Sequence, residues 1–220
     1  MLDCITLDPP SPATACVLWM HGLGADGNDF VQVVPELGLP ENHSVRFVFP
    51  NAPTMPVTIN GGYVMPAWYD IASAEIDKRA DEAGVRKSQA AITELIADQC
   101  AKGIASERIV LAGFSQGGVI ALQTGLRYGE KLGGVMALST YLACVESVGA
   151  EASPANRDIP IFMVHGSVDP VIPIALAKLS KARLETHGYK IEWREYGMPH
   201  SVCAEEIEAI GAFLTRVLKL

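Results

Sequence analysis

The chain has 220 residues, 49% of them hydrophobic and 19% charged, with a formal net charge of -8. A chain of this length buries a full core and is too short for two ordinary domains, so we expect a single domain over residues 1–220. The acidic residues are scattered, and no basic run is present that would neutralise phosphates. This pattern argues against nucleic acid or an anionic membrane surface as a partner.

The cysteines indicate a reducing compartment. They are five in number and show neither C-x-x-C pairing nor a histidine spacing that would suggest a disulfide framework or a zinc site. The first residues carry no positively charged segment, and the apolar stretch 16–20 is far too short to cross a bilayer. We therefore expect a cytoplasmic protein with no metal and no stable membrane insertion. The cysteines are Cys4, Cys16, Cys100, Cys144 and Cys203.

Short apolar runs alternate with amphipathic patterns along the chain. The apolar runs have the length and β-branched content of buried parallel strands, and the amphipathic patterns predict helices. Because the crossovers between parallel strands cover the sheet, we expect an α/β fold with a doubly wound, mostly parallel sheet and helices on both faces. Ligands then bind beyond the carboxyl ends of the strands. The predicted strands are 16–20, 45–49, 109–111, 134–138, 161–164 and 191–196, and the predicted helices run through 92–103, 174–187 and 205–218 and directly after residue 115.

The connection from residue 50 to about residue 80 fits neither pattern. It carries several prolines and the aromatics Tyr63, Trp68 and Tyr69 without a sustained period. Long irregular loops in compact domains are usually functional or disordered, and a disordered segment would not carry so many large apolar side chains. We therefore expect this loop to supply an apolar wall for a ligand.

A nucleophile motif follows the predicted strand at 109–111. Gly113-Phe114-Ser115-Gln116-Gly117 matches G-x-S-x-G and lies between a strand and a helix, which is the context that this motif requires. The glycines are needed because the turn is so tight that side chains there would collide with the neighbouring strand and helix. The Ser115 hydroxyl is thereby presented at a helix N-terminus, which favours developing negative charge. A phosphate-binding loop is a poor alternative, because G-x-x-x-x-G-K-[ST] is absent.

A serine nucleophile needs a base, and the base needs an acid that orients it. In hydrolases that use such a turn, the order along the chain is serine, acid, histidine. Asp169 lies on a turn past the carboxyl end of the strand at 161–164, and His200 follows the strand at 191–196. We therefore predict Ser115 as nucleophile, His200 as base and Asp169 as acid. The other histidines are assigned to surface or loop-shaping roles: His21, His43, His165 and His187.

Acyl transfer also needs N–H donors aimed at the carbonyl oxygen as it becomes negative. The residue after the nucleophile supplies one of them, so we expect the backbone N–H of Gln116 to be a donor. The glycine-rich loop 21–27 follows an early strand, and we assign the second donor to the backbone N–H of Leu23. The glycines of this loop also fit G-x-G-x-x-G, but the acidic residue that a dinucleotide site needs after a second strand does not appear.

With these pieces in place, the sequence resembles the bacterial carboxylesterase and acyl-protein thioesterase family, the small α/β-hydrolases without a large cap. The resemblance covers almost the whole chain. It rests on residues 19–27, 49–53, 57–62, 67–70, 111–118, 138–141 and 165–173. Eukaryotic acyl-protein thioesterases usually carry a tryptophan after the Leu-Ser segment, whereas this chain has Thr140-Tyr141, which is closer to the bacterial esterases.

The resemblance implies no cofactor and an apolar acyl pocket. The implied catalytic residues are Ser115, Asp169 and His200, the implied oxyanion donors are Leu23 and Gln116, and the implied pocket residues are Met65, Trp68, Tyr141, Leu142 and Val171. We expect a serine esterase that hydrolyses small carboxylic esters or thioesters of short to medium acyl chains through an acyl-enzyme; a homodimer is left open. Acyl-protein thioesterase or lysophospholipase activity and a non-catalytic binding protein on the same fold are the alternatives.

Overall fold

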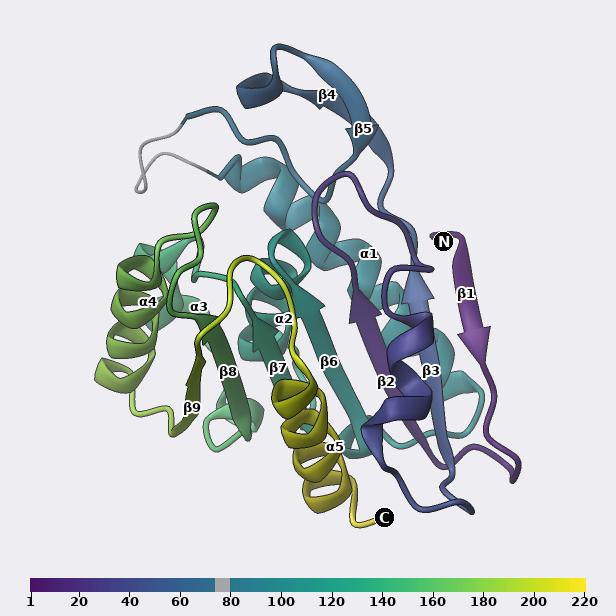
Figure 1. Ribbon diagram of the computed structural model, residues 1–220. Helices are drawn as coiled ribbons and strands as arrows, with labels where there is room; N and C mark the ends of the chain where they lie inside the picture. Colours follow the sequence, from purple (N-terminus) through teal and green to yellow (C-terminus); the bar gives the residue numbers. More distant parts are fainter. Residues whose placement is uncertain (74–79) are drawn as a thin grey trace.

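The computed structural model describes residues 1–73 and 80–220, and a central sheet runs through it (Figure 1). Within these residues the sheet has seven strands in the order β1-β3-β2-β6-β7-β8-β9. All neighbouring pairs are parallel except β1 and β3, which are antiparallel. The strands are β1 (Cys4–Leu7), β2 (Ala15–Met20), β3 (Val45–Pro50), β6 (Ile109–Phe114), β7 (Gly134–Leu138), β8 (Ile161–Gly166) and β9 (Ile191–Tyr196).

Helices cover both faces of this sheet (Figure 1). Helix α5 and the 3-10 helix η1 pack against one face, while α1, α2 and α4 pack against the other. The predicted doubly wound arrangement is therefore confirmed. The helices are η1 (Val31–Leu37), α1 (Glu82–Ala101), α2 (Gln116–Arg127), α3 (Val148–Glu151), α4 (Ile174–Thr186) and α5 (Ala204–Leu218), with short 3-10 turns η2 (Thr58–Asn60), η4 (Ser106–Arg108), η5 (Val145–Ser147) and η6 (Pro154–Asn156).

Strand β2 shows why the central strands read as continuous apolar runs. Successive side chains of a strand point to opposite faces, and here both faces are covered by helices. Leu18 and Met20 join the core under α1 and α2, whereas Val17 and Trp19 join the core under α5. All four are at most 1% exposed. Every position of the strand must therefore be apolar.

All the predicted strands and helices are present, but the structure adds elements that the sequence pattern did not reveal. Strand β1 is a short, half-exposed edge strand. The connection after residue 50 contains a hairpin of β4 (Thr54–Val57) and β5 (Tyr63–Pro66), which stands away from the central sheet (Figure 1). Its side chains are mostly exposed, and prolines lie in both strands, so no alternation marks it. Residues 74–79 of the same connection lie outside the described part of the chain.

The parallel strands bring their carboxyl ends to one edge of the sheet. Strand β2 leads there into the loop 21–27, and β6 leads into Ser115. Strands β8 and β9 lead into Asp169 and His200. Segments far apart in sequence thus meet at the edge where this fold binds ligands. Among the helices described, none is both long and apolar enough to cross a membrane.

Candidate active site

Ser115 sits at the turn between β6 and α2 in a backbone conformation that serine rarely adopts. Its φ is 54° and its ψ is -119°. The turn is held on both sides of the residue, because its N–H donates to the Leu138 carbonyl at 2.9 Å and its own carbonyl accepts from the Thr140 hydroxyl at 2.7 Å. Strained backbone of this kind persists only where the surrounding structure enforces it, and it is concentrated at functional sites.

The glycines around Ser115 are required by close backbone packing. A Cβ atom on Gly113 would lie 2.1 Å from the carbonyl carbon of Gly117. A Cβ atom on Gly117 would lie 2.2 Å from the carbonyl oxygen of Met20, at the end of β2. Both distances are far below van der Waals contact, so the steric reason for the G-x-S-x-G spacing holds in the structure.

His200 and Asp169 form a buried hydrogen-bonded pair. His200 Nδ1 lies 2.7 Å from Asp169 Oδ2, and the Asp169 side chain is 0% exposed. The other carboxylate oxygen, Oδ1, accepts the backbone N–H groups of Val171 and Ile172 at 2.8 and 2.9 Å. Because a carboxylate can only accept, the imidazole proton is assigned to Nδ1, and Nε2 is the nitrogen left to take a proton.

Ser115 and His200 line the same cavity, which has a volume of about 340 Å³. The Phe114 ring packs beside the His200 imidazole, with 4.7 Å between the ring centroids. The His200 side chain is 16% exposed, so it reaches both the buried carboxylate and the cavity. The cavity is lined by Gly22, Leu23, Ala25, Asp29, Ile59, Asn60, Tyr69, Ile71, Phe114, Ser115, Gln116, Tyr141, Val171, Ile172 and His200.

The other two histidines near this edge shape loops. His21 Nε2 accepts the N–H of Ala52 at 3.0 Å, so Nδ1 carries the proton and lies 2.7 Å from the carbonyl oxygen of Gly22. His165 Nε2 lies 2.8 Å from the carbonyl oxygen of Ile172 and 3.4 Å from Asp169 Oδ2. Burial lowers the pKa of both imidazoles, which keeps them neutral.

The two expected oxyanion donors lie at the cavity. Leu23 and Gln116 both line it. In the hydrogen bonds of the described chain, neither of their backbone N–H groups is used. Gln116 is the first residue of α2, where helix N–H groups have no partner within the helix. The loop around Leu23 is fixed by a bond from the Gly24 N–H to the Pro66 carbonyl at 2.9 Å.

The residues expected in the acyl pocket are divided between different places. Tyr141 and Val171 line the catalytic cavity, whereas Met65, Trp68 and Leu142 are not among the residues that line it in the described part of the chain. The expectation for Trp68 needs correction: Trp68 and Tyr69 are both buried, but only Tyr69 lines the cavity. The Trp68 Nε1–H donates to the His21 carbonyl at 2.9 Å, so this side chain supports the loop that follows β2.

The apolar wall comes chiefly from Ile59, Tyr69 and Ile71. They lie in the connection that the sequence predicts to supply such a wall, but none of them is among the individual pocket residues that the resemblance implies. Tyr69 and Tyr141 approach each other through their hydroxyl groups at 3.0 Å. The signal in the sequence for this wall was the aromatic-rich connection after residue 50, which contains all three residues. The sequence could not show which of its neighbouring aromatics faces the cavity.

Tyr141 also lines a second cavity, of about 380 Å³, together with Leu142, Leu176 and Ser180. The Ser180 hydroxyl accepts the N–H of Leu142 at 2.9 Å, which fixes the backbone between the two cavities. The two cavities therefore both border Tyr141.

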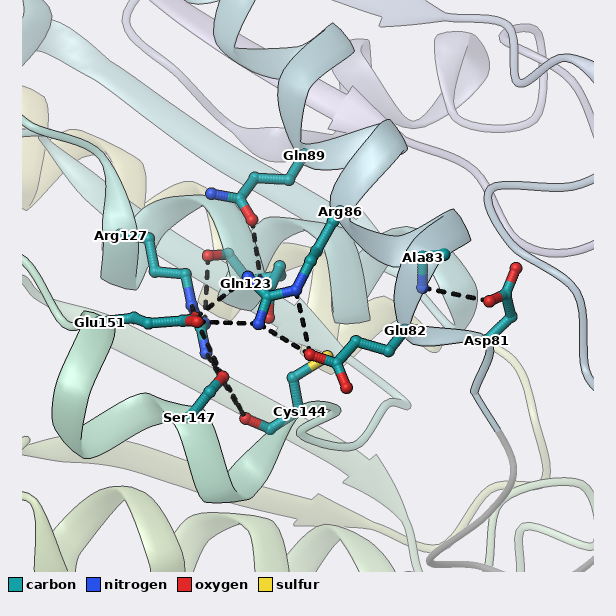
Figure 2. Close-up of polar contacts among 10 residues, drawn as sticks. All are labelled: Asp81, Glu82, Ala83, Arg86, Gln89, Gln123, Arg127, Cys144, Ser147 and Glu151. Atoms are coloured by element: carbon teal, nitrogen blue, oxygen red, sulfur yellow. Dashed lines mark hydrogen bonds and ion pairs between the residues drawn. The ribbon is translucent and has the colours of Figure 1, made fainter.

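An ion-pair network secures the loop after β7 (Figure 2). The Arg127 side chain is 4% exposed, and its Nε donates to Glu151 Oε2 at 2.6 Å. Its Nη2 donates to the Ser147 hydroxyl at 2.9 Å and lies 3.5 Å from the Cys144 carbonyl. Hydrogen bonds from Arg86 and then Arg127 lower the pKa of the Glu151 carboxyl to about 2. The loop is thus tied directly to α2 through Arg127, and α1 joins the network through the ion pair of Arg86 with Glu151.

Comparison with known proteins shows the family and the fold of this chain. A model of the phospholipase/carboxylesterase family matches residues 4–218. Acyl-protein thioesterase 1 of Neurospora crassa is 42% identical over 215 residues, covering 93% of this chain and 87% of that protein. Acyl-protein thioesterase 1 of Schizosaccharomyces pombe is 35% identical over 219 residues, covering 99% of this chain and 97% of that protein.

Solved structures show the same fold. The crystal structure of Arabidopsis thaliana SOBER1 has a TM-score of 0.88 at 28% identity and covers 93% of this chain and 99% of that one. Zea mays acyl-protein thioesterase 2 also has a TM-score of 0.88, at 26% identity, and covers 99% of this chain and 100% of that one. This chain therefore belongs to the phospholipase/carboxylesterase family and has the α/β-hydrolase fold that the resemblance implied.

Proposed function

We propose that this protein is a serine hydrolase that cleaves carboxylic esters and thioesters of short to medium acyl chains through an acyl-enzyme. The observation that carries the proposal is that the strained Ser115 and the His200–Asp169 pair serve one cavity. The family match and the relatives named acyl-protein thioesterase support an ester or thioester substrate.

The reaction follows from the roles of these groups. Ser115 Oγ attacks the carbonyl carbon while His200 Nε2 takes its proton, and the buried Asp169 carboxylate stabilises the imidazolium. The carbonyl oxygen, now negative, binds the N–H groups of Leu23 and Gln116; each such donor lowers the barrier by about 3 kcal/mol. His200 then gives its proton to the leaving oxygen or sulfur as the bond to carbon breaks. A water molecule repeats these steps and releases the acid.

The acyl chain would lie against the apolar wall of Ile59, Tyr69 and Ile71. Each methylene removed from water adds about 0.8 kcal/mol of binding until the space ends. Since Tyr141 lines both the catalytic cavity and the second one, we expect the position of its side chain to set the chain length at which this gain stops. The catalytic cavity of about 340 Å³ suits short to medium chains.

A panel of nitrophenyl esters and matched thioesters of increasing acyl length tests the proposal. We expect kcat/KM to rise over the short chains and then to level or fall. Where deacylation is slower than acylation, rapid mixing should show a burst of nitrophenol equal to the enzyme concentration, because the acyl-enzyme then accumulates. Ser115→Ala is the control and should show neither burst nor turnover. A folded wild-type protein that binds these compounds without turnover would instead support a non-catalytic binding protein.

A further inference from the structure

The catalytic cavity contains a carboxylate that the proposed mechanism does not use. Asp29 lines the cavity along with Ser115 and His200, and its side chain remains accessible to solvent. Among the lining residues in the described chain, no lysine or arginine is present to neutralise it. The cavity is therefore apolar at the wall around Tyr69 and negatively charged at Asp29.

Ring contacts place the segment that carries Asp29 beside Phe114 and His200. Asp29 directly precedes Phe30, whose ring lies 5.7 Å from that of Phe114. The Phe114 ring in turn lies 4.7 Å from the His200 imidazole. The apolar wall comes from residues 57–71 and from Tyr141, which are different segments. The carboxylate and the apolar wall thus reach the cavity from different parts of the chain.

The Asp29 carboxylate is free to take an external cation. In the described part of the chain, no ion pair and no side-chain hydrogen bond engages it, and partial burial raises the pKa of its carboxyl. Neighbouring Asp26 differs, because its Oδ1 accepts from both the backbone N–H and the side-chain amide of Asn28, at 2.7 and 3.0 Å. Asp26 also does not line the cavity among the residues described. The two carboxylates are therefore close in sequence, but only that of Asp29 lines the cavity and is available to a cation there.

The leaving group is the part of the substrate that must lie near His200, because this imidazole gives it the proton when the bond to the acyl carbon breaks. We propose that Asp29 is a specificity-determining residue that favours esters and thioesters whose alcohol or thiol component carries a positive charge, such as a quaternary ammonium or an amine. The inference rests on the proposed function and adds the class of leaving group to it. Charge complementarity between Asp29 and the cation supplies the preference.

The experiment compares two thioesters that differ in one charge. Butyrylthiocholine carries a trimethylammonium group, and S-(3,3-dimethylbutyl) thiobutyrate has the same shape with a neutral carbon in its place. Both release a thiol that one chromogenic disulfide detects. We expect wild-type kcat/KM to be higher for the cation by about three- to tenfold, as for a partly solvated ion pair, and this ratio to fall toward one in Asp29→Asn.

Asp26→Asn is the matched control, since it removes the same charge three residues away, and its ratio should stay within about twofold of wild type. An unchanged ratio in Asp29→Asn would overturn the inference, as would a wild-type ratio of one or an equal fall in Asp26→Asn, which would indicate only the overall negative charge. Absence of turnover of both compounds by wild type would overturn the proposed function, and the inference with it.

Discussion

The two sides of the catalytic cavity are held in different ways. On the elbow side, formed by residues 21–27 and 113–118, backbone atoms pack so closely that only glycine fits at several positions. On the acyl side, formed by residues 57–71 and the loop after β7, the positions depend on side-chain contacts between distant segments, such as Tyr69 with Tyr141. Substitutions on the elbow side should therefore affect chemistry and folding, whereas substitutions on the acyl side should change substrate preference.

The largest effect is expected at the base. His200→Ala removes the imidazole that takes the serine proton, so kcat should fall by roughly 10⁴ or more while the fold stays intact. Asp169→Asn should cost a comparable or smaller factor, because the imidazole is then held in the wrong tautomer. Steady-state kinetics with circular dichroism on each variant provides the measurement. If His21→Ala or His165→Ala abolished turnover in a folded protein while His200→Ala did not, the base would be misassigned.

A large loss of stability is expected where the turn that carries Ser115 packs against β2. Gly117→Ala places a Cβ atom 2.2 Å from the Met20 carbonyl oxygen, so the backbone must shift. We expect the free energy of unfolding to fall by about 3 kcal/mol, as measured by urea denaturation. Gly129→Ala is the control, because a Cβ atom there meets nothing within 4 Å. Equal stability of the two variants would show that the elbow is not tightly packed.

A smaller and more selective effect is expected from the network of Figure 2. Arg127→Met removes the bonds to Ser147 and Cys144 that fix the loop after β7, so KM for the longest accepted acyl esters should rise by about fivefold, with less effect on acetyl esters. Arg86→Met is the control: it also loses an ion pair with Glu151 but makes no bond to that loop. If KM changed with acyl length in the same way in both variants, the network would contribute only to the stability of the fold and not to substrate preference.

The elbow side could be predicted from sequence because its determinants are local. Glycine spacing after a strand, and the order of Ser115, Asp169 and His200 along the chain, specify where these residues lie once the strands are parallel. The acyl side could not be predicted, because neither β4 nor β5 carries an alternating pattern and the orientation of the following aromatics is set from a distance. The Gln116 side chain accepts the N–H of Trp68 at 3.0 Å and donates to the Tyr69 carbonyl at 2.9 Å.

Those two bonds hold a segment in which both aromatic rings are buried but only Tyr69 lines the cavity. Two adjacent aromatic residues offer no local clue to this choice. Gln116 itself was predicted only for its backbone N–H, and its side-chain role depends on contacts across 48 positions of sequence. Local signals thus predicted which residues meet at this edge of the sheet, and long-range contacts decide which of the two aromatic residues lines the cavity.

The most direct test of the central claim is covalent labelling of the nucleophile. A fluorophosphonate probe reacts only with a serine that an adjacent base activates, so one equivalent should add to the wild-type protein and peptide mass spectrometry should locate it at Ser115. Ser115→Ala should remain unlabelled, and His200→Ala should label far more slowly. Full labelling of Ser115→Ala, or an adduct found on a different residue of the wild-type protein, would contradict the account.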